Sequence, residues 1–193
     1  MTMQIPDSYD INGEEYINLR QEGTGFFDPC GYGFKLKRKR LSCLVCGYIG
    51  RYVIADGRLF LEKLSIETED DRYPDLNGVA YSPEKGYVGV HLPITCTGRI
   101  LFSDALSNAY FLIDCLLQAK QLYEYDFVEG KVVRIVDHSR AALALQKIYQ
   151  CRILCRLLGN DAQRIIRLLP GKLRRPLEWI WNIKPVQRIA TEE

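Results

Sequence analysis

The chain has 193 residues, and 47% of them are hydrophobic, a fraction that excludes a disordered protein and indicates a globular one with a core. Its net charge of +2 is unevenly distributed, because residues 138–193 carry +7 and residues 1–137 therefore carry −5. An acidic body with a basic tail predicts that the tail meets an acidic surface, on this chain or on a partner.

The expected compartment follows from the N-terminus, the tail and the cysteines. The first residues lack the basic region and the apolar run of a secretory signal, so we expect no export. The most apolar stretch of the tail, residues 148–158, is interrupted by Arg152 and Arg156, so we expect no membrane span. Seven cysteines, an odd number, favour reduced thiols in a cytoplasm.

Turn-forming residue pairs predict β-hairpins along the first two-thirds of the chain. Such pairs suit the two central positions of a tight turn, because their residues tolerate positive φ. Each pair lies between two strand-like segments: Asn12-Gly13, Asp56-Gly57 and Glu129-Gly130.

The strongest hairpin signal covers residues 41–64. Its first half, residues 41–54, is rich in Val, Ile and Tyr, which favour strands. Its second half alternates as a strand does, with Leu59, Leu61 and Lys63 between Phe60, Glu62 and Leu64.

Four further segments are informative before the tail. Residues 67–86 form a long acidic connection, and loops of that length are usually functional or mobile. Residues 87–92 and 99–102 look like further strands. Residues 107–120 fit either a helix capped by Asp104 or a buried strand, and periodicity does not arbitrate a short apolar run.

The tail predicts helices. Asp137 or Ser139 can cap a helix that runs to about Leu158, and shorter helices are expected at residues 160–169 and 177–183.

The expected fold class is therefore α+β, an antiparallel β meander over about residues 9–136 followed by a basic helical C-terminal tail. Residues 1–137 would form the β-rich domain. Residues 138–193 would form a helical segment that packs on this domain or extends from it.

A pair of cysteines has the spacing of half a zinc site. Cys43 and Cys46, followed by Gly47, could aim two thiolates at one metal, but no second pair with this spacing completes a tetrahedral site. A strand over residues 41–54 would instead point the two side chains to opposite faces. We therefore expect no metal and no cofactor.

A basic run gives an alternative function. Runs of this kind bind phosphate backbones, although they also occur on exposed sheet edges, where they oppose edge-to-edge pairing. The nucleic-acid candidates are Lys35, Lys37, Arg38, Lys39 and Arg40.

Catalytic motifs are absent from the sequence. The two histidines, His91 and His138, lie in no recognisable nucleophile–base pattern, and no phosphate-binding or dinucleotide-binding loop is present. His138 beside Asp137 could be a base oriented by a carboxylate, but a role at the start of a helix is the simpler interpretation. We expect a protein that is not an enzyme.

Three segments resemble small bacterial cytoplasmic β-rich proteins without known catalysis. Residues 46–61 are similar to their aromatic strand–turn–strand segment, with Tyr52 in the place of a Trp, and residues 98–104 and 123–133 are similar to later segments. The resemblance implies a bacterial cytoplasmic β-fold and assigns no functional residues.

The tail is the expected interaction element. A helix with apolar residues on two sides cannot bury them all against one sheet, so another helix, a second copy or a foreign partner must cover the rest. Burial of the tail in the core is the alternative. We expect a binding protein, for example immunity-like or antitoxin-like, that self-associates or binds a protein partner through Arg152, Arg156, Arg174, Arg175, Trp179 and Trp181.

Overall fold

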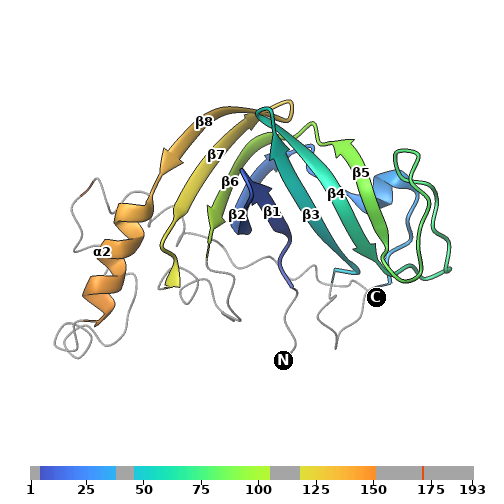
Figure 1. Ribbon diagram of the computed structural model, residues 1–193, viewed down its shortest axis with the longest axis horizontal. Coiled ribbons are helices and arrows are strands. Elements are labelled where there is room, and N and C mark those ends of the chain that lie inside the picture. Colours follow the sequence, from blue (N-terminus) through green and yellow to red (C-terminus); the bar gives the residue numbers. More distant parts are fainter. Residues whose placement is uncertain (1–4, 38–45, 105–117, 151–170, 172–193) are drawn as a thin grey trace, which may run out of the picture.

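A computed structural model describes residues 5–37, 46–104, 118–150 and 171 (Figure 1). The strands of this part of the chain are β1 (Ser8–Ile11), β2 (Glu14–Thr24), β3 (Tyr48–Ala55), β4 (Arg58–Ile66), β5 (Tyr87–Pro93), β6 (Thr97–Ser103), β7 (Leu122–Val128) and β8 (Lys131–Asp137). A 3-10 helix, η1 (Pro29–Tyr32), follows β2, and an α-helix, α2 (Ser139–Gln150), follows β8.

Seven of these strands form a closed ring in the order β3, β1, β2, β6, β7, β8 and β4. The ring closes because β4 pairs with both β3 and β8. The remaining strand, β5, pairs with β4 beyond the point where β8 leaves it. The fold is therefore a small β-barrel with one added strand.

The predicted fold class, an α+β meander with a helical tail, is wrong. The barrel brings together strands that are distant in sequence, and β1 runs parallel to β3, whereas a meander joins consecutive antiparallel strands. The described residues contain one α-helix, α2. The prediction failed because turn residues specify local hairpins, while pairing between distant strands depends on how the interior packs.

The three predicted hairpin turns are confirmed. Asp56 and Gly57 have φ angles of 50° and 68°, the left-handed values that a two-residue turn requires. The other turn pairs, Asn12-Gly13 and Glu129-Gly130, also have positive φ at both positions. The strands expected near residues 87–92 and 99–102 are present as β5 and β6.

Aromatic side chains fill the barrel. Tyr9 of β1 stacks on Tyr52 of β3, with ring centroids 4.8 Å apart, and Tyr9 also contacts Phe102 of β6 at 4.8 Å. Phe102 in turn contacts Tyr125 of β7 at 5.3 Å. Each such pair contributes roughly 0.5–1.5 kcal/mol beyond the burial of its area, so the rings join four strands of the barrel from inside.

The ring is closed by few backbone hydrogen bonds. The N–H of Leu59 donates to Gly130 O at 3.0 Å, and the N–H of Val132 donates to Gly57 O at 2.8 Å. The connection between β5 and β6 lies against this seam, where the N–H of Gly130 donates to Cys96 O at 2.7 Å. A Cβ at Gly130 would lie 2.0 Å from Ile94 O, so this close approach requires glycine.

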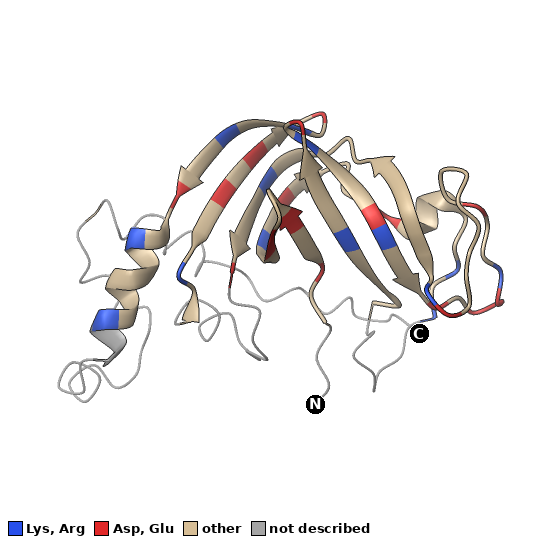
Figure 2. Ribbon diagram, in the orientation of Figure 1, with Lys and Arg blue, Asp and Glu red and all other residues tan. Residues whose placement is uncertain are grey.

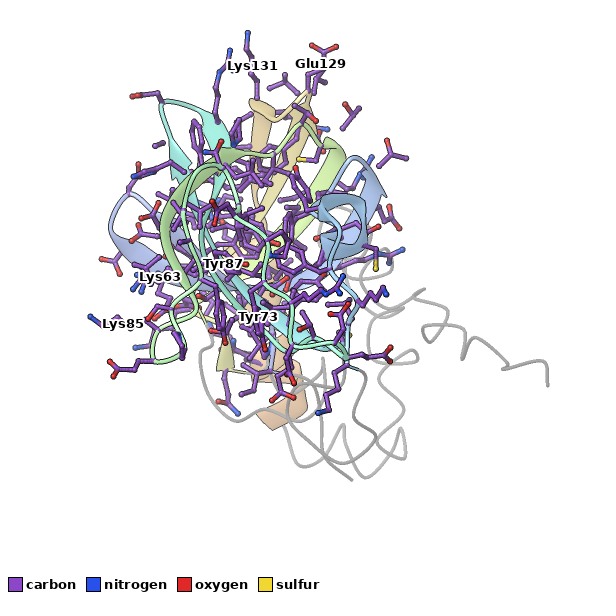
Figure 3. All side chains as sticks on the ribbon, turned by 90° about the vertical axis from the view of Figure 1, so that its right-hand side faces the viewer. Lys63, Tyr73, Lys85, Tyr87, Glu129 and Lys131 are labelled. Carbon is purple, nitrogen blue, oxygen red and sulfur yellow. The ribbon has the colours of Figure 1, made fainter. Side chains whose placement is uncertain are left out.

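The acidic connection at residues 67–86 is fixed to the barrel by aromatic contacts. Tyr73 and Tyr81 stack with ring centroids 3.7 Å apart, and Tyr81 contacts Tyr87 of β5 at 5.4 Å. Tyr87 also donates a hydrogen bond to Pro74 O at 2.6 Å, and Figure 3 shows Tyr73 close to Tyr87. The connection therefore packs as part of the fold.

The helix α2 begins at Ser139, as the capping pattern predicts. The Ser139 N–H donates to Asp137 Oδ1, and the Ser139 hydroxyl accepts from the N–H of Leu122 at 3.0 Å. Ala142 and Leu145 are fully buried, so this part of the helix docks on the barrel.

The later predicted helices, and most of the ambiguous segment at 107–120, lie outside the described residues. No helix in the described part of the chain is long and apolar enough to cross a membrane.

Asp7, just before β1, is a partly buried carboxylate. Its Oδ1 accepts a hydrogen bond from the N–H of Gly50 in β3 at 2.7 Å. Burial raises the pKa of this carboxyl from 3.8 to about 6, and the hydrogen bond from Gly50 opposes the rise only in part. Ionised Asp7 therefore destabilises the folded state at neutral pH.

The turn at Gly57 gives a stability prediction. Gly57→Val should lower the free energy of unfolding by about 1–3 kcal/mol, because a β-branched residue is strained at positive φ. No atom lies within 4 Å of a Cβ built there, so the loss measures backbone strain alone. Chemical unfolding checks it. Gly31→Val is the control, because Gly31 is also exposed and unobstructed but its φ is not in the positive range; an equal loss in both variants would refute the turn assignment.

Asp7 gives a pH prediction. A carboxyl whose pKa rises on folding binds its proton more tightly in the folded state, so its ionisation costs stability as pH rises from about 4 to about 6. Asp7→Asn should therefore be more stable than the parent protein by up to roughly 3 kcal/mol at pH 8 and equal to it near pH 4. Urea unfolding at the two pH values measures the difference. The exposed Asp75→Asn should show no such pH-dependent gain, and a pH-independent effect of Asp7→Asn would contradict the assignment.

Candidate functional site: a groove on the outer face of the barrel

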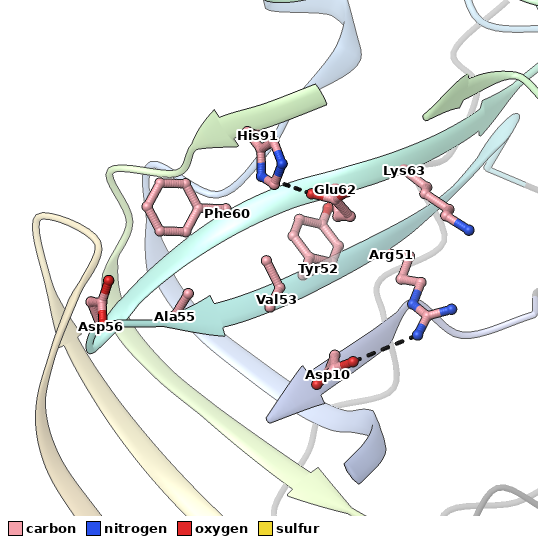
Figure 4. Close-up of a pocket in the computed structure, with 10 residues that line it drawn as sticks. All are labelled: Asp10, Arg51, Tyr52, Val53, Ala55, Asp56, Phe60, Glu62, Lys63 and His91. Atoms are coloured by element: carbon pink, nitrogen blue, oxygen red, sulfur yellow. Dashed lines mark ion pairs between the residues drawn. The ribbon is translucent and has the colours of Figure 1, made fainter. Parts of the chain in front are cut away.

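A groove of about 460 Å³ lies on the outer face of the barrel, over β1, β3, β4 and β5 (Figure 4). The residues that line it are Asp10, Arg51, Tyr52, Val53, Ala55, Asp56, Phe60, Glu62, Lys63 and His91. In Figure 4, Arg51 and Lys63 lie at one end, Ala55 and Asp56 lie at the other, and Glu62 and Tyr52 lie between them. The volume is within the range of small-molecule sites, roughly 300–1,000 Å³.

Two cations face each other at one end of the groove. Arg51 of β3 and Lys63 of β4 are register partners in antiparallel strands, and both are exposed on the outer face. Arg51 lies 3.7 Å from Asp10 of β1, whereas Lys63 has no ion-pair partner among the described residues. Like charges directly opposite each other destabilise a sheet, and Asp10 offsets only Arg51, so a second anion would stabilise this end of the groove.

A β-bulge places Glu62 beside Lys63. The β3–β4 register passes from Arg51 opposite Lys63 to Tyr52 opposite Leu61, which leaves Glu62 without a partner in β3. Leu61 and Leu64 are both fully buried, so the two residues between them lie together on the outer face. The acidic and basic positions of β3 and β4 lie next to one another in Figure 2.

The neighbouring strand β5 bulges at the same level. Gly89, Val90 and His91 lie between the residues that pair with Lys63 and Leu61, and His91 has a φ of 45°. The Asn77 amide holds this segment by donating to Val90 O at 2.7 Å. A positive φ at a residue other than glycine costs on the order of 1–3 kcal/mol, and such strain is typical of functional sites.

The strained His91 reaches Glu62. Nδ1 of His91 lies 2.9 Å from Oε2 of Glu62, within ion-pair range, and the imidazole is 72% exposed. Oε2 is itself buried and has no hydrogen-bond donor in the described part of the chain, so the ion pair with His91 is its polar contact there. A buried acceptor without a hydrogen-bond donor costs about 1–3 kcal/mol, and a ligand that displaces the imidazole and donates to this oxygen would remove that cost.

The floor of the groove is apolar. Val53 and Phe60 are register partners on the outer face. The adjoining Tyr52 also lines the groove, although its ring is buried in the barrel against Tyr9. Burial, with a smaller effect of the nearby Asp7, raises the pKa of Tyr52 well above its ordinary value, so the phenol stays neutral. The groove therefore joins an apolar floor to a cationic end.

Of the two cysteines weighed as half a zinc site, the structure describes only Cys46. Cys46 lies exposed in the turn before β3, and the following Gly47 has a φ of 84°. The interpretation of Cys46 as a strand residue is therefore wrong, because the strand begins at Tyr48. Cys43 lies outside the described residues. Within the described ranges, no group of three or more His, Cys, Asp or Glu residues could hold a metal.

The basic run is described only in part. Lys35 Nζ lies 3.6 Å from Asp70 Oδ2, and the N–H of Lys37 donates to Glu67 O at 2.9 Å. These lysines therefore lie along the acidic connection. The rest of the run, Arg38, Lys39 and Arg40, and the predicted partner-binding residues Arg152, Arg156, Arg174, Arg175, Trp179 and Trp181 lie outside the described residues.

Sequence reasoning missed the groove, although one signal pointed to it. Strict alternation places Lys63 on the same face as the buried Leu59 and Leu61, which is wrong, because the bulge moves Lys63 outward. The signal is the run from Leu61 to Leu64, in which two charged residues separate two apolar ones. Such a run breaks the period of two and indicates a bulge.

A second charged cluster lies where α2 joins the barrel. His138 Nε2 lies 3.3 Å from Glu124 Oε2, and Arg99 lies 3.7 Å from Glu124 Oε1. The His138 and Glu124 side chains are 13% and 9% exposed, so the cluster is closed to a ligand. His138 O also accepts from the N–H groups of Ala141 and Ala142, which supports its predicted role at the start of the helix.

Compared with protein-family models, with curated proteins and with solved structures, the chain matches none of them.

Proposed function

We propose that this chain is a non-enzymatic, cytoplasmic binding protein that recognises its ligand in the outer groove of the barrel. The ligand is expected to carry a carboxylate next to an apolar group. The observation that carries the proposal is the pairing of Arg51 with Lys63 beside the apolar pair Val53 and Phe60. An anion between the two cations would replace a repulsive contact by two attractive ones.

The groove suits recognition on the barrel surface. Its polar groups come from strands β1, β3, β4 and β5, whose positions are fixed by pairing, so little ordering is needed when a ligand binds. The interior of the barrel, by contrast, is filled by aromatic rings. A ligand therefore finds its apolar contact and its charge partner on the outside.

The predicted role of the tail remains part of this proposal. Partner binding or self-association through Arg152, Arg156, Arg174, Arg175, Trp179 and Trp181 stays a prediction, and so does the resemblance to bacterial β-rich proteins. A groove that binds a small ligand and a tail that binds a protein are compatible, since α2 follows the end of β8 and lies away from β4 and β5 (Figure 1).

Nucleic-acid binding through the run at residues 35–40 is the alternative. The ion pair of Lys35 with Asp70 and the acidic connection alongside weigh against it, because they offset the positive charge that a phosphate backbone needs. Salt separates the two functions: affinity for nucleic acid falls steeply with salt, while binding that uses an apolar floor falls less.

The groove is tested with hydrocinnamate, an aromatic ring joined to a carboxylate by a short chain. Titrated into isotope-labelled protein, it should shift backbone amide resonances of β3 and β4 around the groove. Lys63→Gln should weaken this binding by about tenfold, the loss expected for one charge-assisted hydrogen bond. The same variant should be more stable than the parent by about 0.2–1 kcal/mol at low salt, because the contact with Arg51 is relieved.

Lys131→Gln is the matched control. Lys131 is the register partner of Arg58, so it also faces a like charge, but it does not line the groove. This variant should bind hydrocinnamate as the parent does. Shifts scattered over the whole barrel, or equal weakening by both substitutions, would contradict the proposed site.

A further inference from the structure

We infer that the ligand of the groove is a free α-amino acid with an apolar side chain, an inference that rests on the proposed function. Its carboxylate lies between Arg51 and Lys63, its ammonium group lies at Glu62, and its side chain lies on Val53 and Phe60. The bulge in β4, the Glu62 oxygen without a hydrogen-bond donor in the described residues, and the apolar pair each support one part of this assignment.

The bulge in β4 matches the charge spacing of an amino acid. In a regular strand, neighbouring residues point to opposite faces, so an acid and a base on one face lie at least two residues apart. Here Glu62 and Lys63 are consecutive and both line the groove. Their Cα atoms are about 3.8 Å apart across one peptide bond. The ammonium and carboxylate of an α-amino acid are attached to one carbon, so they suit an acid and a base that leave one face of a strand at consecutive positions.

The carboxylate of Glu62 is the partner for the ammonium group. Its Oε2 is buried under the His91 imidazole, whose Nδ1 lies 2.9 Å away, and it has no hydrogen-bond donor among the described residues. This imidazole is 72% exposed, so it can turn aside when an ammonium group approaches. An ammonium group carries three N–H donors that can rotate to meet this oxygen. A carboxylate without an amine leaves the oxygen unsatisfied, so the groove should discriminate strongly between the two.

The apolar pair provides the place for the side chain. Val53 of β3 and Phe60 of β4 are register partners, two and three positions along their strands from Arg51 and Lys63. A ligand whose charged group is held at the cationic end therefore extends its side chain along the strands onto this pair. An aromatic side chain gains an additional ring contact with Phe60.

Three matched compounds test the assignment on the intact chain. L-phenylalanine has both charged groups, hydrocinnamate lacks the amine, and phenethylamine lacks the carboxylate. Their dissociation constants are measured by titration of the isotope-labelled protein, with the groove amides of β3 and β4 as the readout. Phenylalanine should bind at least about tenfold more tightly than either analogue, because each loses one charge-assisted contact.

The variant Glu62→Gln tests whether the Glu62 carboxylate binds the ammonium group of the ligand. The advantage of phenylalanine over hydrocinnamate should disappear in this variant, while the affinity for hydrocinnamate should not fall. Glu84→Gln, which removes an exposed carboxylate outside the groove, should keep the full advantage. The comparison of compounds on the parent protein holds even where a variant fails to fold.

The outcomes separate the inference from the proposed function. If hydrocinnamate binds in the groove as tightly as phenylalanine, the amino-acid assignment is overturned and the carboxylate site stands. If phenethylamine binds as tightly as phenylalanine, the cation pair takes no carboxylate, and both proposals are overturned. If none of the compounds shifts the groove amides, both are overturned as well.

Discussion

The parallel pairing of β1 with β3 is the contact on which the barrel and the groove both depend. It places Tyr9 beside Tyr52, and the two stacked rings form the centre of the interior. On the outer face, the same pairing brings Asp10 to Arg51. One strand of four residues therefore supplies the core with an aromatic ring and the groove with an acidic wall.

Local and distant contacts differ in how far the sequence reveals them. The turns at Asp56-Gly57 and Glu129-Gly130 were predictable, because positive φ at consecutive positions requires particular residues. The pairing of β1 with β3 was not, because no residue type marks a strand as the parallel neighbour of another. That choice is made by the packing of rings such as Tyr9 and Phe102, which only the assembled interior defines.

The groove could not be predicted from the sequence for a related reason. Its charged residues are ordinary surface residues in the sequence, and they form a site only because a bulge shifts the register between Leu61 and Leu64. In the sequence, the indication of that shift is the pair of consecutive charged residues between two leucines. The strain at His91 left no such trace, since a histidine with positive φ looks like any other in the sequence.

The few hydrogen bonds that close the ring have a consequence for how the protein folds. The hairpins β3–β4 and β7–β8 join residues close in the chain and can form within microseconds. The contact of Asp7 with Gly50 spans 43 residues, so β1 can take its place only after a long loop closes. High contact order of this kind slows folding. Completing the ring therefore requires pairings between segments distant in the chain, β1 with β3, β2 with β6 and β8 with β4, and such a topology is typical of slow folding.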